Sequence, residues 1–218
     1  FNLQQTSGSI QNVTSFSVFD LTTLASAAYT RFGINTDSDL TNINSASTSY
    51  TQNAGVYTGE IRATSNTEGP LQWIAGLFLF ADKVKYPNYN SGANNFTSTQ
   101  YSKAYAVFGE ATYNVTDALS VTGGLRYSWE ERVFKSRTLA GVPMADASDA
   151  FEKVSPRVVV RYEFSPRASV YASYSQGFKS GLFNTTQTSG PYEAVSPEVL
   201  DSFEVGIKSG PARWLRGD

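Results

Sequence analysis

The residues of this sequence that could do chemistry are carboxylates and arginines that recur at alternate positions. One residue separates Glu60 from Arg62, and the same spacing joins Arg161 to Glu163. Alternate residues of a β-strand lie on one face, so such charges would gather on a single surface. They could line the path of a substrate, or they could form cross-strand ion pairs. The full set, called here the inner charged set, is Glu60, Arg62, Glu110, Arg126, Glu130, Arg157, Arg161 and Glu163.

The composition removes most catalytic chemistry. Histidine and cysteine are both absent from the 218 residues, so the chain lacks the commonest general base, a thiol nucleophile and any disulfide. No glycine-rich phosphate-binding loop or metal-ligand cluster occurs. The net charge of -2 gives no attraction to nucleic acid. We therefore expect a protein that is not an enzyme and uses no cofactor.

A second group with binding potential is a set of tyrosines in or beside polar connecting segments. Aromatic side chains in such segments often contact ligands; the alternative is loop packing or anchoring at a membrane surface. These candidates for substrate contact are Tyr86, Tyr89, Tyr101 and Tyr192.

Long alternating strands must position these residues. In 118–132, Val121, Leu125 and Trp129 share one parity, and the other parity is polar or charged. An ordinary strand sustains such alternation over about five or six residues, and this segment sustains it over roughly twice that length. A tilted strand of that length crosses a bilayer. No run approaches the 18 or so apolar residues of a transmembrane helix.

The connections between the expected strands alternate between short and long. Short turns occur at 66–70, 114–117, 165–167 and 209–211, and polar loops are expected at 36–50, 85–99, 135–150 and 181–198. This rhythm is typical of an outer-membrane barrel with tight periplasmic turns and long extracellular loops. The expected strands cover 9–18, 22–35, 51–65, 71–84, 100–114, 118–134, 151–164, 168–180 and 199–209, with the start of a tenth near 214.

Aromatic residues mark the edges of the expected membrane band. Tyr105 and Tyr113 are eight residues apart, about 26 Å along a strand and roughly 20 Å along the membrane normal at a tilt near 40°. The predicted girdle is Tyr105, Tyr113, Tyr127 and Trp129. The inner charged set then lines the lumen. Segment 71–84 is apolar on both faces, which indicates that something packs against it inside the barrel.

Several segments resemble the central barrel of TonB-dependent receptors. They are VFGEATYNVTDALSVTGGLRY (107–127), VSPR (154–157), VYASYSQGFKSGLFN (170–184), PEVLDSFEVGIKS (197–209), EIRATS (60–65) and WIAGLF (73–78). Together they cover most of 50–210.

The resemblance implies a 22-stranded antiparallel transmembrane β-barrel with an N-terminal plug in its lumen. It implies active import of a bulky, scarce nutrient, such as a ferric siderophore or cobalamin, or sometimes a glycan. The implied partners are outer-membrane lipid, the protein's own plug domain and the inner-membrane TonB complex. The implied location is the outer membrane of a Gram-negative bacterium. Residues 1–218 would be a single partial barrel domain of about 9–10 strands, open on its own, without the plug and the C-terminal strands.

Two other functions fit the same residues. A passive porin would share the barrel and lack a plug. A secreted β-rich adhesin or sandwich domain would be soluble without detergent. A barrel enzyme fits worst, because such hydrolases generally depend on a histidine.

Overall fold

A computed structural model describes residues 1–37, 47–91, 94–184 and 191–210, and these form one antiparallel sheet. Within the described residues, no helix is long and apolar enough to cross a membrane. The strands are β1 (Asn2–Ser15), β2 (Phe19–Asp37), β3 (Ser47–Ser65), β4 (Leu71–Ser91), β5 (Asn94–Asn114), β6 (Leu119–Thr138), β7 (Pro143–Ser165), β8 (Ala168–Lys179) and β9 (Glu198–Ser209).

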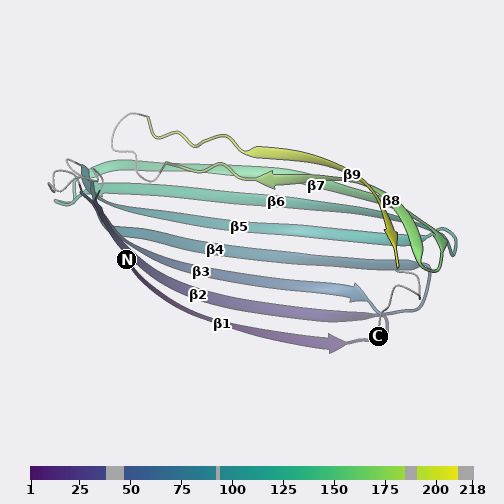
Figure 1. Cartoon of the computed structure of the whole chain (residues 1–218). Helices are drawn as coiled ribbons and strands as arrows, with labels where there is room; N and C mark the ends of the chain where they lie inside the picture. Colours follow the sequence, from purple (N-terminus) through teal and green to yellow (C-terminus); the bar gives the residue numbers. More distant parts are fainter. Residues whose placement is uncertain (38–46, 92–93, 185–190, 211–218) are drawn as a thin grey trace, which may run out of the picture.

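The sheet is a simple meander in which each strand pairs with its neighbours in the sequence, from β1 to β9. It curves like a section of a barrel wall, with β1 and β9 at its two edges (Figure 1). The prediction of an all-β, antiparallel, open barrel segment is confirmed. The expected start of a tenth strand, near 214, lies outside the described residues.

The two ends of the strands differ. At the turn end, β1–β2, β3–β4, β5–β6 and β7–β8 are joined by brief connections. Their polar side chains hold the backbone: Asn66 Nδ2 donates to Phe16 O at 2.9 Å, and Leu119 N donates to Thr116 Oγ1 at 3.0 Å. At the opposite end, called here the hairpin end, the strands are longer than the sequence predicts.

Two of the predicted long loops are wrong. Most of 85–99 lies in β4 and β5, and most of 135–150 lies in β6 and β7. The β6–β7 turn spans only 139–142, with Gly141 at a φ of 87°, a left-handed conformation that glycine adopts without strain. Most residues of these segments are small or polar, and scattered rings such as Tyr89 and Phe96 do not form the sustained apolar alternation that marks a strand in a membrane. Cross-strand backbone hydrogen bonds form regardless of that pattern.

Other strand boundaries also shift. The first turn lies at 16–18, earlier than predicted, and β2 begins at Phe19. β2 and β3 extend into the predicted loop 36–50, as far as Asp37 and from Ser47. The described part of 181–198 contains no strand before β9, apart from a single bridge between Leu182 and Val195.

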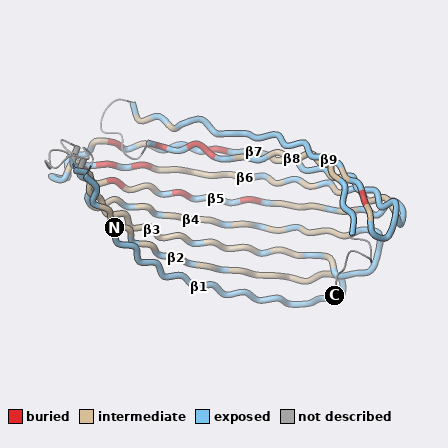
Figure 2. Tube along the Cα trace, viewed as in Figure 1, coloured by how far each residue is buried: buried red, intermediate tan, exposed pale blue. Residues whose placement is uncertain are grey.

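The register gives each face of the sheet a fixed set of residues. Outward-pointing residues on the convex face are mostly exposed, such as Leu79 on β4 and Leu125 on β6. Residues of the opposite parity point into the concave face and are more covered, and the few buried ones lie mainly on β5–β7 toward the hairpin end (Figure 2). There, Phe183, which follows β8, packs on the concave side against Phe134 of β6 and Ala145 of β7.

Glycines on the concave face make room for large neighbours. Gly76 on β4 pairs with Phe108 on β5, and a Cβ at Gly76 would lie 2.6 Å from the Phe108 ring. Likewise, a Cβ at Gly206 would lie 2.5 Å from the ring of Tyr171. The curved wall therefore packs large side chains over glycine backbone on its inner side.

Candidate functional site

The inner charged set lies together on the concave face, as the cross-strand register requires. Most of its members are paired. Arg62 Nη1 lies 3.1 Å from Glu60 Oε1, Arg157 Nη1 lies 2.5 Å from Glu110 Oε2, and Arg161 Nη2 lies 2.8 Å from Glu163 Oε1. Glu130 pairs with Arg132. Half-exposed pairs of this kind contribute little to stability, so their effect is to give the concave wall a fixed pattern of charge.

Arg126 differs from the rest of the set. Its guanidinium lies 5.4 Å from the centre of the Phe78 ring and 5.8 Å from that of Phe108, and its Nε donates to Ser128 Oγ at 3.1 Å. Among the described residues, no carboxylate lies within ion-pair distance of it. A guanidinium that lies over two aromatic rings keeps some of its N–H groups available to donate hydrogen bonds to a partner in the concavity.

The apolar inner face of β4 continues this surface. Ile74, Phe78 and Phe80 share the parity of Gly76 and point into the concavity. The middle of the wall thus presents aromatic and aliphatic side chains beside its ion pairs, a surface suited to a folded protein occupant.

A row of aromatic rings crosses the concave face at the hairpin end. Phe32 on β2 lies 6.0 Å from Tyr50 on β3, measured between ring centres. Tyr50 stacks on Tyr89 of β4 at 5.6 Å, and Tyr89 stacks on Phe96 of β5 at 4.8 Å. We call Phe32, Tyr50, Tyr89 and Phe96 the rim aromatic row. Tyr86, another predicted contact residue, lies 5.9 Å from Tyr50.

Sequence reasoning missed Phe32, Tyr50 and Phe96. Parity could have placed all three on the concave face, because β2–β3 and β5–β6 pair without a register shift, and Tyr50 and Phe96 share the parity of Glu60 and Glu110. The register shifts in β3–β4 and β4–β5 put the extra residue in β4, so they hide the pattern for Tyr89, which has the parity of the outward residues of β4.

The predicted contact tyrosines do not form one group. Tyr192 packs near Phe134 and Phe183 on the concave side, and its ring centre lies 6.1 Å from that of Phe134. Arg132 holds the residues that directly follow β8, because its Nη2 donates to Ser180 Oγ at 3.1 Å. Tyr101 lies on the convex face instead, where Lys83 Nζ is 5.1 Å from its ring centre. The sequence placed Tyr86, Tyr89 and Tyr101 in or beside loops, and all three lie within strands.

The predicted girdle residues all lie on the convex face. Tyr105 stacks on Trp129 with ring centres 4.8 Å apart, and Tyr127 Oη donates to Glu152 Oε2 at 2.8 Å. Tyr113 lies toward the turn end. On β4–β7, the outward positions from the level of Tyr113 to that of Tyr127 carry no charged residue.

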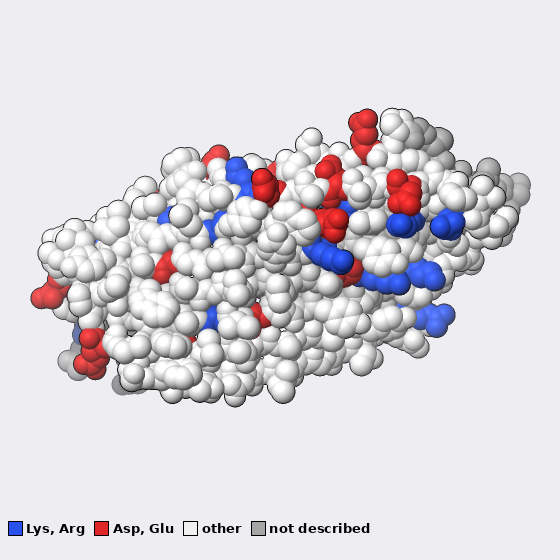
Figure 3. Space-filling model, turned by 180° about the vertical axis from the view of Figure 1, so that it is seen from behind, with Lys and Arg blue, Asp and Glu red and all other residues white. Residues whose placement is uncertain are grey.

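The convex face is largely uncharged over its middle, and charged side chains gather toward the hairpin end (Figure 3). This distribution matches a surface that meets lipid over its middle and water beyond it.

Among the described residues, no group of three or more His, Cys, Asp or Glu side chains could hold a metal ion. The concave wall offers ion pairs, aromatic rings and one cation–aromatic cluster. Such groups bind and orient an occupant without covalent chemistry.

Comparison with known proteins gives one family. The family described as TonB dependent receptor-like, beta-barrel matches residues 1–218. A curated relative, an uncharacterized TonB-dependent receptor of Haemophilus influenzae, is 24% identical over 132 residues, which are 57% of this chain and 37% of the relative.

Solved structures share the fold. The ferric yersiniabactin uptake receptor FyuA from Yersinia pestis has a TM-score of 0.80 at 18% identity, covering 95% of this chain and 33% of that one. The siderophore receptor PiuA from Acinetobacter baumannii has a TM-score of 0.75 at 14% identity, covering 94% and 37%. The copper transporter OprC has a TM-score of 0.75 at 12% identity, covering 96% and 38%. The chain therefore spans little more than a third of the length of these proteins.

Proposed function

This chain belongs to the TonB-dependent receptor β-barrel family, and from that premise we propose that it forms part of the wall of an outer-membrane importer. Family and fold are those of receptors and transporters, not of enzymes. The proposed cargo is a bulky, scarce nutrient of the ferric siderophore class, with cobalamin or a glycan as the alternatives. Import is an activity of the whole receptor, of which this chain supplies strands and substrate-facing surface.

The rim aromatic row is the observation that supports this cargo best. Rings on four adjacent strands form a rigid apolar platform at the hairpin end of the concave wall, with Phe32, Tyr50 and Tyr89 partly exposed and Phe96 buried beside Tyr89. Such a platform suits a large chelate with apolar or ring-bearing groups, because aromatic side chains bury much area at little entropic cost. A small ion or a monosaccharide would contact only part of it.

The middle of the concave wall suits the receptor's own plug domain. Ile74, Phe78 and Phe80 supply an apolar surface, and Arg126 supplies hydrogen-bond donors beside it. A water-filled pore gives no reason for an apolar inner wall. The TonB complex would act on the plug, outside the residues of this chain.

We assign the hairpin end to the cell exterior and the convex face to outer-membrane lipid. Under this assignment the rim aromatic row lies at the external mouth of the passage. The short turns lie in the periplasm, as in other barrels of this type.

Iron-limited growth tests the proposal. A strain without the full-length receptor is complemented with the wild type or with the double variant Tyr50→Ala/Tyr89→Ala, and growth is measured on a panel of ferric siderophores. We expect the wild type to restore growth on at least one chelate. The double variant should need roughly tenfold or more of that chelate, because each ring contributes about 0.5–1.5 kcal/mol beyond its buried area.

The matched control is Tyr162→Ala, which removes a tyrosine from the convex face. Equal outer-membrane levels of all variants are verified by immunoblot. If no ferric siderophore restores growth and the receptor takes up cobalamin or a glycan instead, that compound is the cargo. Uptake that persists in a strain without TonB would identify a passive pore instead.

A further inference from the structure

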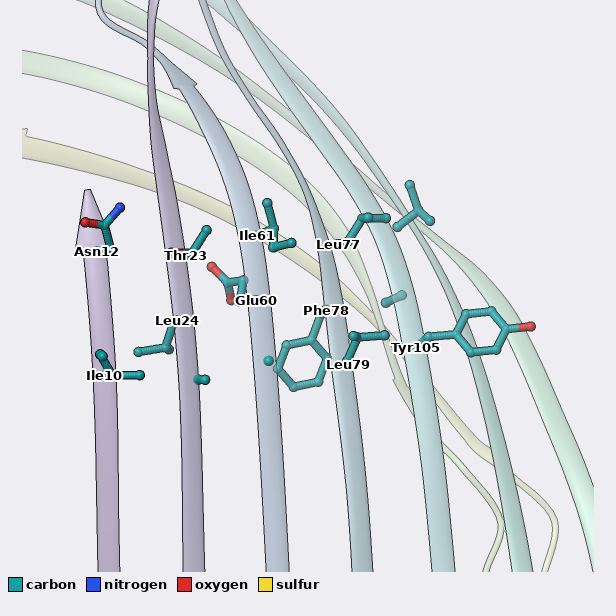
Figure 4. Close-up of a pocket in the computed structure, with 14 residues that line it drawn as sticks. Ile10, Asn12, Thr23, Leu24, Glu60, Ile61, Leu77, Phe78, Leu79 and Tyr105 are labelled. Atoms are coloured by element: carbon teal, nitrogen blue, oxygen red, sulfur yellow. The ribbon is translucent and has the colours of Figure 1, made fainter. Parts of the chain in front are cut away.

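Inward-pointing side chains carry little positive charge between the middle of the wall and the rim aromatic row. Alternate residues of each strand point to opposite faces: Glu60 and Phe78 point to the concave side, and Ile61 points to the other (Figure 4). The same alternation fixes the inward residues of β1–β7 from the row of Ser26 to the row of Phe32. We call these residues the upper concave wall; all of them lie in the described part of the chain.

On β1–β3, the upper concave wall presents neutral side chains throughout. They include hydroxyl and amide groups, such as those of Ser9, Thr30 and Gln52, among small or apolar groups. Ser26 Oγ and Thr58 Oγ1 lie 2.6 Å apart across the β2–β3 pair and share a hydrogen bond. These strands therefore offer a ligand hydrogen bonds and no ion pair.

On β4–β7, the charged members of the upper concave wall are mostly acidic. They are Asp82, Glu130, Arg132 and Asp149. Three carboxylates and one guanidinium leave this surface a formal charge of -2. The guanidinium is already bound, since Arg132 pairs with Glu130 and its Nη2 donates to Ser180 Oγ at 3.1 Å. An anionic ligand would meet surplus negative charge here and no unpaired cation on this described surface.

Asp82 is the carboxylate with the fewest partners. It is half-buried and lies opposite Ser102, whose side chain is only 1% exposed. Asp82 Oδ1 and Ser102 Oγ are both buried without a hydrogen-bond partner among the described residues. The ion pairs of the described residues include neither Asp82 nor Asp149. Because a carboxylate oxygen can only accept hydrogen bonds, a ligand that supplies N–H or O–H donors, or a positive charge, fits this wall.

The charge of a ferric chelate depends on its iron-binding groups. A hydroxamate carries a single negative charge, so a set of them that saturates ferric iron gives a neutral complex. A catecholate carries two, and the saturated complex is strongly anionic. Like charges that face each other across a binding surface lower the affinity, and this effect excludes wrong partners.

We propose that the upper concave wall selects ferric chelates without net negative charge, and that the cargo is a ferric hydroxamate. Its amide or ammonium groups approach Asp82 and Asp149, and its uncharged backbone lies against β1–β3 below the rim aromatic row. This inference rests on the proposed import of a siderophore and narrows that cargo to one charge class.

Equilibrium binding to cells that carry the full-length receptor and lack TonB tests the selection, because such cells bind a chelate without importing it. Two complexes of similar size are loaded with radioactive iron: a linear ferric trihydroxamate with a free ammonium group, and a ferric tricatecholate. We expect the trihydroxamate to bind at least about tenfold more tightly. The ratio should fall as salt is added, since salt screens the repulsion of the tricatecholate.

Removing the acidic charge should change the ratio. Asp82→Asn/Asp149→Asn keeps the shape of both side chains and should strengthen tricatecholate binding by about fivefold or more. It should also weaken binding of the ammonium-bearing trihydroxamate. The matched control, Glu131→Gln/Asp146→Asn, removes carboxylates of the convex face and should leave the ratio unchanged.

Adding a cation tests the same idea without touching Asp82. Thr30→Lys places an ammonium group on the concave face of β2, beside the rim aromatic row, and should strengthen tricatecholate binding several-fold. Tyr29→Lys, which adds the same charge on the convex face, should not.

Tighter binding of the tricatecholate by the wild type would overturn the inference and leave the proposed import intact. So would a ratio that neither the asparagine variant nor Thr30→Lys changes. Binding of neither chelate, in cells where cobalamin or a glycan binds, would instead overturn the proposed siderophore cargo on which the inference rests.

Discussion

Leu125 and Thr122 lie three residues apart on β6 and meet different surroundings. Leu125 is 60% exposed on the convex face. Thr122 lies on the concave face, where its hydroxyl is 2.8 Å from that of Thr112. Because the convex face is assigned to lipid, arginine at 125 would place a charge among acyl chains, and arginine at 122 would join a charged wall.

We expect Leu125→Arg to lower the free energy of unfolding of the full-length receptor by about 2–4 kcal/mol. Thr122→Arg should cost much less. Urea-induced unfolding in lipid vesicles measures both. Equal losses would contradict the assignment of the two faces.

Packing on the concave face leaves no room for a side chain at Gly76. A Cβ there would lie 2.8 Å from the backbone oxygen of Ile61, in addition to its contact with Phe108. Gly76→Ala should therefore destabilise the receptor by about 1–3 kcal/mol. Gly123→Ala is the control, because nothing lies within 4 Å of its Cβ position. A neutral result at 76 in the same assay would show that Phe108 moves aside freely.

Parity predicted the inner charged set and the girdle at this scale, because an uninterrupted alternation fixes the face of every residue between 100 and 134. The same rule excludes Tyr101 from the concave face, since it shares the parity of Tyr105. The substrate contact of Tyr101 was predicted from the composition of a supposed loop, and it stays a prediction.

At the scale of elements, hydrophobic alternation identified strand cores and missed strand extensions. The segments beyond Tyr86 on β4 and before Tyr101 on β5 are mostly polar, and the rings of Tyr89 and Phe96 are too few to give an apolar periodicity. Their strands continue because each backbone finds hydrogen-bond partners in its neighbour. The sequence could not show this, since the pairing depends on the whole sheet.

The assignment of the hairpin end to the cell exterior predicts that the two ends of the sheet differ in their reactivity with reagents added outside the cell. The chain has no cysteine, so single substitutions give specific labels. In intact cells with the full-length receptor, a membrane-impermeant maleimide should label Ala140→Cys, in the β6–β7 turn. Asp117→Cys, in the β5–β6 turn, should react only after the outer membrane is permeabilised. The opposite pattern would invert the barrel and place the rim aromatic row in the periplasm.

At the scale of the whole molecule, the sheet has two open edges. β1 and β9 each have one paired neighbour, and β9 exposes Phe203, Val205 and Ile207 by 69–84%. Open edges and exposed apolar side chains favour intermolecular pairing.

Residues 1–218 expressed alone should therefore aggregate, or remain in solution only with detergent. Size-exclusion chromatography with light scattering measures this. A monodisperse, detergent-free monomer with a sharp thermal transition would favour a secreted β-rich domain over a membrane wall.

Collision accessibility of nitroxide labels along β6 would show which face of the wall meets lipid. Each position from Val121 to Leu125 is labelled in turn in the full-length receptor, reconstituted in lipid. We expect oxygen accessibility to alternate with a period of two, with maxima at 121, 123 and 125 and minima at 122 and 124. Maxima at 122 and 124, or uniform access of a water-soluble nickel complex to all five positions, would contradict a membrane-spanning wall with its convex face in lipid.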